Sequence, residues 1–215
     1  MLYMFRAGIE EKLKQFVQNG GTLIMTYWSG IVNETDLCHL GGTPHGLTDV
    51  LGLHSEEIDG LYDGEVNHFL PVDGNELQLK ESYTCQHLCD LVRLNGAVPL
   101  MKYADNFYKG YPALTVNEYG SGHAYYICAD AEADFYYNLY QRIITRQQIR
   151  PILDRIPEGI EVSSRVNKDF EYVFVQNYTC NAIDICLPDD IKILSGEYDG
   201  TIPEYSTIIF QRIRK

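Results

Sequence analysis

A long apolar run is missing from this chain of 215 residues. No stretch approaches the roughly 18 residues that a membrane-spanning helix needs, so we expect no membrane span. Charged residues such as Arg6, Glu10 and Lys12 interrupt the start of the chain, which excludes the apolar core of a signal peptide. The six cysteines do not form a disulfide framework in a chain of this length. These absences predict a cytoplasmic protein with reduced thiols.

Basic clusters are absent as well. The chain has 17 Lys and Arg residues against 30 Asp and Glu residues, which gives a formal net charge of −13. Without a basic patch the chain has no surface that would follow a phosphate backbone. The same charge disfavours binding to anionic membranes. We therefore expect neither nucleic acid nor a membrane as a partner.

Tyrosine, in contrast, occurs 17 times. Its ring is apolar and its hydroxyl is polar, so it suits interfaces and sugar-facing sites. The count is typical of wet aromatic surfaces, and compositional drift explains it about equally well. The hydrophobic share of 45% and the charged share of 22% are those of an ordinary soluble globular protein.

The N-terminal part of the chain reads as a helix followed by a strand. Apolar residues at helical spacing predict an amphipathic helix over residues 8–17, closed by a Gly pair. These residues are Ile9, Leu13, Phe16 and Val17. Residues 22–27 form a short apolar run without helical period, which predicts a buried parallel strand. Such a strand needs a parallel neighbour, which we expect before Met1.

Trp28 follows this strand and opens a polar, Gly-rich loop that continues to residue 54. Ligands and partners of open α/β sheets lie beyond the carboxyl ends of the strands. Tyr27 and Trp28 are therefore candidate residues for an active site, a binding site or a subunit contact.

The middle of the chain predicts two hairpins and two helices. A short helix is expected over residues 46–51, and an acidic, solvated run over 53–72. Asn95-Gly96 predicts a hairpin between residues 84–94 and 97–104, and the turn at 119–122 predicts a second one. A further helix is expected over residues 132–145.

The C-terminal part changes character. Short strands separated by turn residues predict a small antiparallel sandwich, with strands over residues 161–166, 170–177, 182–187, 191–195 and 207–213. We therefore expect an α/β domain over residues 1–155 and a small all-β domain over residues 156–215.

Several residue patterns suggest chemistry, and each also has a simpler explanation. Asn-Glu dipeptides at residues 33–34, 75–76 and 117–118 resemble the acid/base position of retaining glycosidases, but a dipeptide is a weak signal. Alternation places Cys85, His87 and Cys89 on one face of a strand. Buried thiols beside a surface histidine explain this pattern better than zinc, because a second ligand pair is missing. Ser29 has Gly on one side only, which disfavours a nucleophile elbow.

Long segments of the chain resemble the middle domain of bacterial β-galactosidases of glycoside hydrolase family 42. They are residues 16–36 (FVQNGGTLIMTYWSGIVNETD), 39–42 (HLGG), 47–52 (LTDVLG) and 112–126 (PALTVNEYGSGHAYY). Residues 157–162 (PEGIEV) and 171–177 (EYVFVQN) are similar to the small C-terminal β domain of that family.

The resemblance implies a truncated amidotransferase- or flavodoxin-like α/β trimerisation domain, followed by a small antiparallel β domain. The catalytic (β/α)8 barrel with both catalytic glutamates would lie upstream. The resemblance also implies that this chain contains no catalytic residue, and we expect neither a cofactor nor a metal site in it. The parent enzyme would form a trimer and hydrolyse galactosides in its barrel, while Tyr27 and Trp28 would line a subunit interface or a pocket wall. Two other hypotheses remain: a stand-alone hydrolase or amidotransferase that uses Ser29 or a cysteine with a histidine, and a carbohydrate-binding module in which Trp28 stacks on sugars.

Overall fold

A computed structural model describes residues 1–79 and 81–214. The chain divides into two compact units, residues 1–147 and 148–215, and each unit is described by itself. The boundary expected from the sequence, between residues 155 and 156, lies further along the chain, within the second unit.

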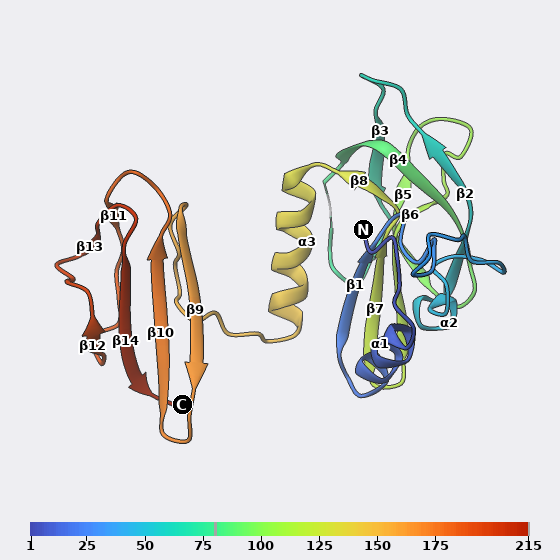
Figure 1. The fold of residues 1–215 in the computed structure, drawn as a ribbon. Coiled ribbons are helices and arrows are strands. Elements are labelled where there is room, and N and C mark those ends of the chain that lie inside the picture. The colour runs from blue at the N-terminus through green and yellow to red at the C-terminus, as the bar shows by residue number, and fades with distance from the viewer. Residues whose placement is uncertain (80, 215) are drawn as a thin grey trace. The chain divides into compact units, whose positions relative to one another are not determined.

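The first unit consists mainly of strands (Figure 1). Its helices are α1 (Ile9–Gln18), α2 (Thr48–Leu51) and α3 (Ala133–Arg146). Its strands are β1 (Thr22–Thr26), β2 (Leu53–Gly60), β3 (Asn67–Pro71), β4 (Tyr83–Leu94), β5 (Val98–Tyr103), β6 (Pro112–Tyr119), β7 (Gly122–Ile127) and β8 (Ala129–Ala131).

These strands form one mixed sheet in the order β1-β7-β6-β5-β3-β4-β2, with β8 paired to β4. Among the described strand pairs of this sheet, β1–β7 is parallel and the others are antiparallel. The α/β character expected from the sequence is therefore confined to α1 and the β1–β7 pair. The rest of the unit is an antiparallel sheet.

The β1–β7 pair is held by close packing against α1. Val17 is the buried residue of α1, and the helix ends at Gln18, followed by Asn19 and by Gly20, which has a φ of +100°. Gly122 lies so near the carbonyl oxygens of Val17 and Gly21 that a Cβ atom there would collide with both. The Gly-rich ends of α1 and β7 thus allow two backbones to meet, a role that glycine fills best.

Local signals predicted most elements but not all of their partners. The hairpin of β6 and β7 is confirmed, with Leu114 opposite Ile127. The hairpin at Asn95-Gly96 is wrong, because β3 lies between β4 and β5 and pairs with both. Residues 53–72, which we expected to be an acidic, solvated run, also contain the strands β2 and β3.

Many tyrosines belong to the core of the first unit. Tyr103, Tyr108, Tyr125 and Tyr126 are all fully buried, and each hydroxyl has a hydrogen-bond partner. Phe69 and Phe135 meet edge to face beside them, with ring centroids 5.2 Å apart. Part of the high tyrosine content therefore serves packing and not a wet surface.

The second unit is all-β in its described part, as expected. Its strands are β9 (Ile160–Val166), β10 (Phe170–Asn177), β11 (Ile183–Asp184), β12 (Lys192–Ser195), β13 (Thr201–Ile202) and β14 (Thr207–Ile213). An antiparallel sheet has the order β12-β14-β10-β9, and β11 pairs with β13. Val173, Val175, Ile208 and Phe210 lie in its core.

Candidate functional site

The backbone leaves the sheet at Tyr27 and Trp28, directly after β1. The Tyr27 amide still continues the ladder and donates to the Ile127 carbonyl at 2.6 Å. Trp28 then has a φ of +50°, in the left-handed region that few side chains other than Asn and Asp adopt readily. Its amide donates to Oδ2 of Asp90 in β4 at 3.1 Å. A side chain from a distant strand thus fixes the turn that carries the single Trp.

Asp90 is the most unusual group near this turn. It is only 1% exposed, and its Oδ2 also accepts the Tyr126 hydroxyl at 2.6 Å. Its Oδ1 is buried and has no hydrogen-bond partner among the described residues. Burial raises the pKa of Asp90 to about 6, although the bonds from Tyr126 and Trp28 oppose this shift. Asp90 was not among the residues predicted from the sequence, where its one signal is an acid inside the apolar run 88–92.

Ser29 is buried, and its hydroxyl makes two hydrogen bonds to the backbone. Its hydroxyl donates to the Thr26 carbonyl at 2.7 Å and accepts the Leu2 amide at 2.9 Å. The following residue, Gly30, donates its amide to the Leu2 carbonyl at 2.8 Å. Ser29 therefore ties the N-terminal segment to the turn, and none of its hydrogen bonds within the described residues comes from a histidine.

Exposed apolar side chains occur in the N-terminal segment and in the loop on either side of Trp28 in the fold, and one of them, Tyr3, lies beside its ring. The Tyr3 ring lies 6.3 Å from the Trp28 ring, and its hydroxyl donates to Asp36 in the following loop at 3.1 Å. Beside Asp36, Leu37 is 65% exposed, and Leu40 in the same loop is 92% exposed. We call the residues Met1, Leu2, Tyr3, Met4, Trp28, Leu37 and Leu40 the Trp28 surface. Scattered apolar residues are normal on a surface, but contiguous ones mark interaction sites.

Tyr27 lies at the edge of a second polar group. Burial raises its pKa to about 12, and the nearby Asp130 carboxylate adds to the shift. Asp130 also contacts Nδ1 of His87 at 2.7 Å. His87 is exposed whereas Cys85 and Cys89 are buried, so the expectation of buried thiols beside a surface histidine is confirmed. The expectation that all three share one face is wrong, because His87 has a φ of +61° at an irregularity of β4 that breaks the alternation.

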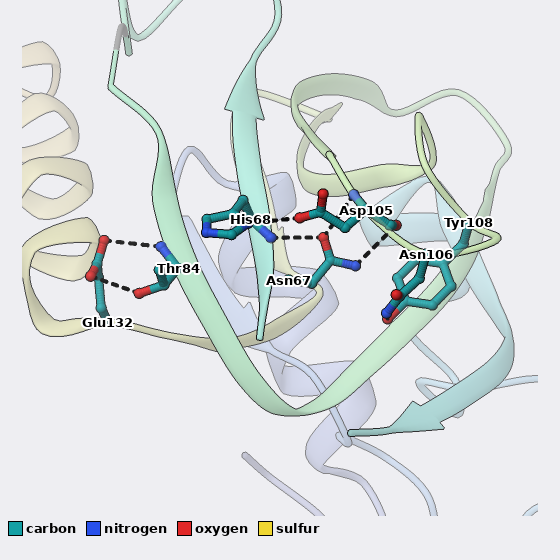
Figure 2. Close-up of polar contacts among 7 residues, drawn as sticks. All are labelled: Asn67, His68, Thr84, Asp105, Asn106, Tyr108 and Glu132. Carbon is teal, nitrogen blue, oxygen red and sulfur yellow. Dashed lines mark hydrogen bonds and ion pairs between the residues drawn. The ribbon is translucent and has the colours of Figure 1, made fainter. Parts of the chain in front are cut away.

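A third polar group braces the loop after β5 (Figure 2). Asn67 is fully buried, and its amide nitrogen donates to the Asp105 carbonyl at 3.1 Å. Its side-chain oxygen accepts the amides of His68 at 2.7 Å and of Asp105 at 3.1 Å. The Asp105 carboxylate meets Nδ1 of His68 at 2.7 Å, and Asn106 donates to the Tyr108 hydroxyl at 3.2 Å. The loop is thus fixed along its length.

Thr84 and Glu132, also drawn in Figure 2, join β4 to the start of α3. The Thr84 amide and hydroxyl donate to the two carboxylate oxygens of Glu132, at 3.0 and 2.7 Å. This bidentate contact fixes the helix that follows β8.

The three Asn-Glu dipeptides have separate surroundings. Glu34 and Glu118 are exposed, whereas Glu76 pairs with Arg146 at 2.6 Å. Asn117 donates to the Val50 carbonyl at 2.8 Å. Within the described residues, the structure contains no group of three or more His, Cys, Asp or Glu side chains arranged to hold a metal ion. None of the helices in this part of the chain combines the length and hydrophobicity that crossing a bilayer requires.

Comparison with known proteins gives consistent matches. Residues 1–150 match the family described as the β-galactosidase trimerisation domain. The β-galactosidase Pbg of Clostridium perfringens is 42% identical over 200 residues, which are 92% of this chain and 29% of that protein. The crystal structure of the β-galactosidase from Rahnella sp. R3 matches 100% of this chain with a TM-score of 0.84 and 39% identity, over 32% of that chain.

A solved structure of a catalytic mutant of Gan42B, a GH42 β-galactosidase from G. stearothermophilus, also covers 100% of this chain. Its TM-score is 0.80 at 32% identity, over 31% of that chain. The chain therefore spans only about a third of the length of the relatives that it matches. Because the family match covers most of the chain and the relatives agree with it, the chain belongs to the family of β-galactosidase trimerisation domains of glycoside hydrolase family 42.

Proposed function

We propose that this chain is the self-association and accessory region of a family 42 β-galactosidase, with no hydrolysis of its own. The observation that carries the proposal is the match of residues 1–150 to the β-galactosidase trimerisation domain. The parent enzyme would hydrolyse terminal β-galactosides by a retaining double displacement, using two carboxylates of a barrel outside this chain. Its galactoside substrate would reach that barrel and not this region.

The Trp28 surface is the part of the chain that we assign to contact with a neighbouring subunit. Aromatic residues are enriched at interfaces, and truncation of a central Trp often removes much of the binding energy. The bond from the Trp28 amide to the buried Asp90 supports this role, because a fixed backbone loses little entropy when a partner binds. Tyr27 would support the turn from the sheet side.

Sedimentation velocity of the purified chain over a range of concentrations tests the proposal. We expect a trimer that dissociates on dilution, and a weaker one, by at least about tenfold, for Trp28→Ala. Tyr178→Ala is a matched control, because Tyr178 is an exposed aromatic residue of the second unit. A monomer at every concentration, both for the chain and for the chain joined to its parent barrel, would overturn the proposal.

We further propose that the first unit is a shortened amidotransferase- or flavodoxin-like domain of a cytoplasmic enzyme. Support comes from α1 and the parallel β1–β7 pair that follows it. Strand β1 stands at one end of the sheet order, so one of its edges has no partner among the described strands. A parallel strand from the rest of the parent would pair there. Slower hydrogen exchange of the Ile24 amide in the whole enzyme than in the chain is the expected result, and equal exchange contradicts it.

A carbohydrate-binding role is a second candidate, favoured by the partly exposed Trp28 ring near Tyr3. Titration with galactose or lactose tests it through the fluorescence of the single Trp. A saturable change that Trp28→Phe abolishes supports sugar binding, and no change at high millimolar sugar excludes it. Catalysis by Ser29 has no comparable support, since its hydroxyl is bonded between Thr26 and Leu2.

A further inference from the structure

Phe107 stands at the tip of the loop between β5 and β6 and is 73% exposed. Exposure of one aromatic ring is unremarkable, but the support beneath this ring is unusual. The ring meets the Tyr108 ring edge to face at 5.0 Å, and Tyr108 is fully buried. The exposed Phe107 ring therefore packs directly on a residue of the core.

The loop has few ways to move. Asn67 binds both the amide and the carbonyl of Asp105, as Figure 2 shows. Backbone bonds close the other side of the loop, where the Gly110 amide donates to the Tyr103 carbonyl at 2.8 Å and the Tyr103 amide to the Tyr111 carbonyl at 2.9 Å. A rigid aromatic anchor loses little conformational entropy on binding, which is the property of a hot-spot residue.

A groove of about 400 Å³ lies next to the base of the same loop. Its wall includes the apolar residues Leu94, Pro99, Tyr111 and Pro112, together with Glu56, Arg93 and Lys102. Arg93 is paired with Glu56 at 2.8 Å, which leaves Lys102 as the basic group of the groove that has no ion-pair partner among the described residues. The groove is mainly apolar and has room for an aromatic side chain.

A ring of identical subunits requires two complementary surfaces on each copy, and the exposed Phe107 ring and the groove are such a pair. A threefold ring joins two different surfaces of each copy, whereas a twofold contact joins a surface to itself. Asp105 and Lys109 also give the loop no net charge, so it can approach another copy of this acidic chain without strong repulsion. These features favour a second copy of the chain as the occupant of the groove.

We propose that Phe107 of one copy inserts into the groove lined by Leu94, Pro99 and Tyr111 of the next copy, and that this contact closes the trimer. The inference rests on the self-association proposed above and names the surfaces that make it. It is separate from the Trp28 surface, so the two sets of substitutions report on different contacts.

Sedimentation of Phe107→Ala gives the first test. We expect association to weaken about thirtyfold, as for truncation of a hot-spot residue. The melting temperature, measured at a dilution where both proteins are monomeric, should stay at the wild-type value, because the ring is mostly exposed. Tyr178→Ala should change neither quantity. If the wild type forms a trimer and Phe107→Ala associates equally strongly, this inference is overturned and the proposed function stands.

Cross-linking between two different variants gives the second test. In a background where the exposed Cys38, Cys180 and Cys186 are changed to Ser, Phe107→Cys chains are mixed with Pro99→Cys chains and oxidised with diamide. The expected product is a covalent pair containing one chain of each kind, which an intramolecular contact cannot produce. Absence of this pair while the mixture still sediments as a trimer would overturn the inference. A wild-type chain that stays monomeric, both alone and joined to its parent barrel, would overturn the inference and the proposed function together.

Discussion

The buried Asp90 should make the stability of the first unit depend on pH in an unusual direction. Burial raises its pKa from 3.8 to about 6, so the folded state holds the proton more tightly than the unfolded state does. Its contribution to stability is complete below about pH 4 and is lost as the pH rises through about 6. A shift of about two pKa units corresponds to about 3 kcal/mol of unfolding free energy.

Asp90→Asn isolates this effect. The amide oxygen can still accept the bonds from Trp28 and Tyr126, but the side chain cannot ionise. Urea unfolding followed by the fluorescence of Trp28 would be measured from about pH 4.5 to 7.5 for both proteins. All other titrating groups cancel in the difference between them. We expect the variant to gain about 2 kcal/mol relative to the wild type over this range, because part of the full change already occurs between about pH 3.8 and 4.5.

A difference that stays constant over this range would refute the reasoning, because it would mean that Asp90 does not exchange its proton there. Tyr126→Phe provides a second check. It removes a hydrogen bond that favours the ionised form, so the transition of Asp90 should move to higher pH. Movement to lower pH would contradict the assigned cause.

Two further substitutions test the packing that supports the site. Asn67→Ala should lower the unfolding free energy by about 3 kcal/mol, since it leaves the buried backbone groups of Asp105 without partners; urea unfolding with an unchanged midpoint would contradict this. Gly122→Ala should lower the melting temperature by several degrees, because the methyl group would collide with the Val17 carbonyl, whereas Gly60→Ala has space around it and should have little effect. Equal melting temperatures for the two Gly variants would exclude the close contact of α1 and β7.

Local patterns in the sequence were sufficient for elements whose structure is decided locally. The spacing of Ile9, Leu13 and Val17 predicted α1, and the Gly turn at residues 120–122 predicted the hairpin of β6 and β7. In both cases the hydrophobic period and the turn residues lie within one short stretch. The parallel pairing of β1 was predicted as well, but its described partner is β7 and not a strand before Met1, and Met25 is its one buried residue.

Pairing over long distances was beyond the same reasoning. Asn95-Gly96 is a strong hairpin signal, yet the Asn95 and Ala97 amides both donate to the Gly52 carbonyl. The turn therefore serves the junction of α2 and β2, while β4 pairs with β2, β3 and β8. Tertiary partners decide which strands meet, and a dipeptide carries no information about them.

The candidate site was predictable only in part. Trp28 was identified because it follows an apolar strand, and its role at an interface stays a prediction. Neither Asp90 nor Phe107 had a signal of its own, because the importance of each comes from residues distant in the sequence. Asp90 meets Trp28 across 62 positions, and the Phe107 loop is fixed by Asn67, which lies 38 positions before Asp105.

The position of Asp90 is hard to explain by stability alone. A buried carboxylate with an unpartnered oxygen destabilises the folded unit by about 3 kcal/mol at neutral pH, and an uncharged amide side chain would avoid this cost. Only a hydrogen-bond acceptor at this position can bind the Trp28 amide and so stabilise the left-handed backbone conformation of Trp28. If the Trp28 surface contacts another subunit, the fixed turn loses less conformational entropy on association, which offsets part of the destabilisation caused by Asp90. Asp90→Leu removes the cost of ionisation but leaves the Trp28 amide and the buried Tyr126 hydroxyl without their acceptor, so it should not stabilise the isolated unit at pH 7 and should weaken the trimer. A trimer as strong as that of the wild type would separate Asp90 from the interface.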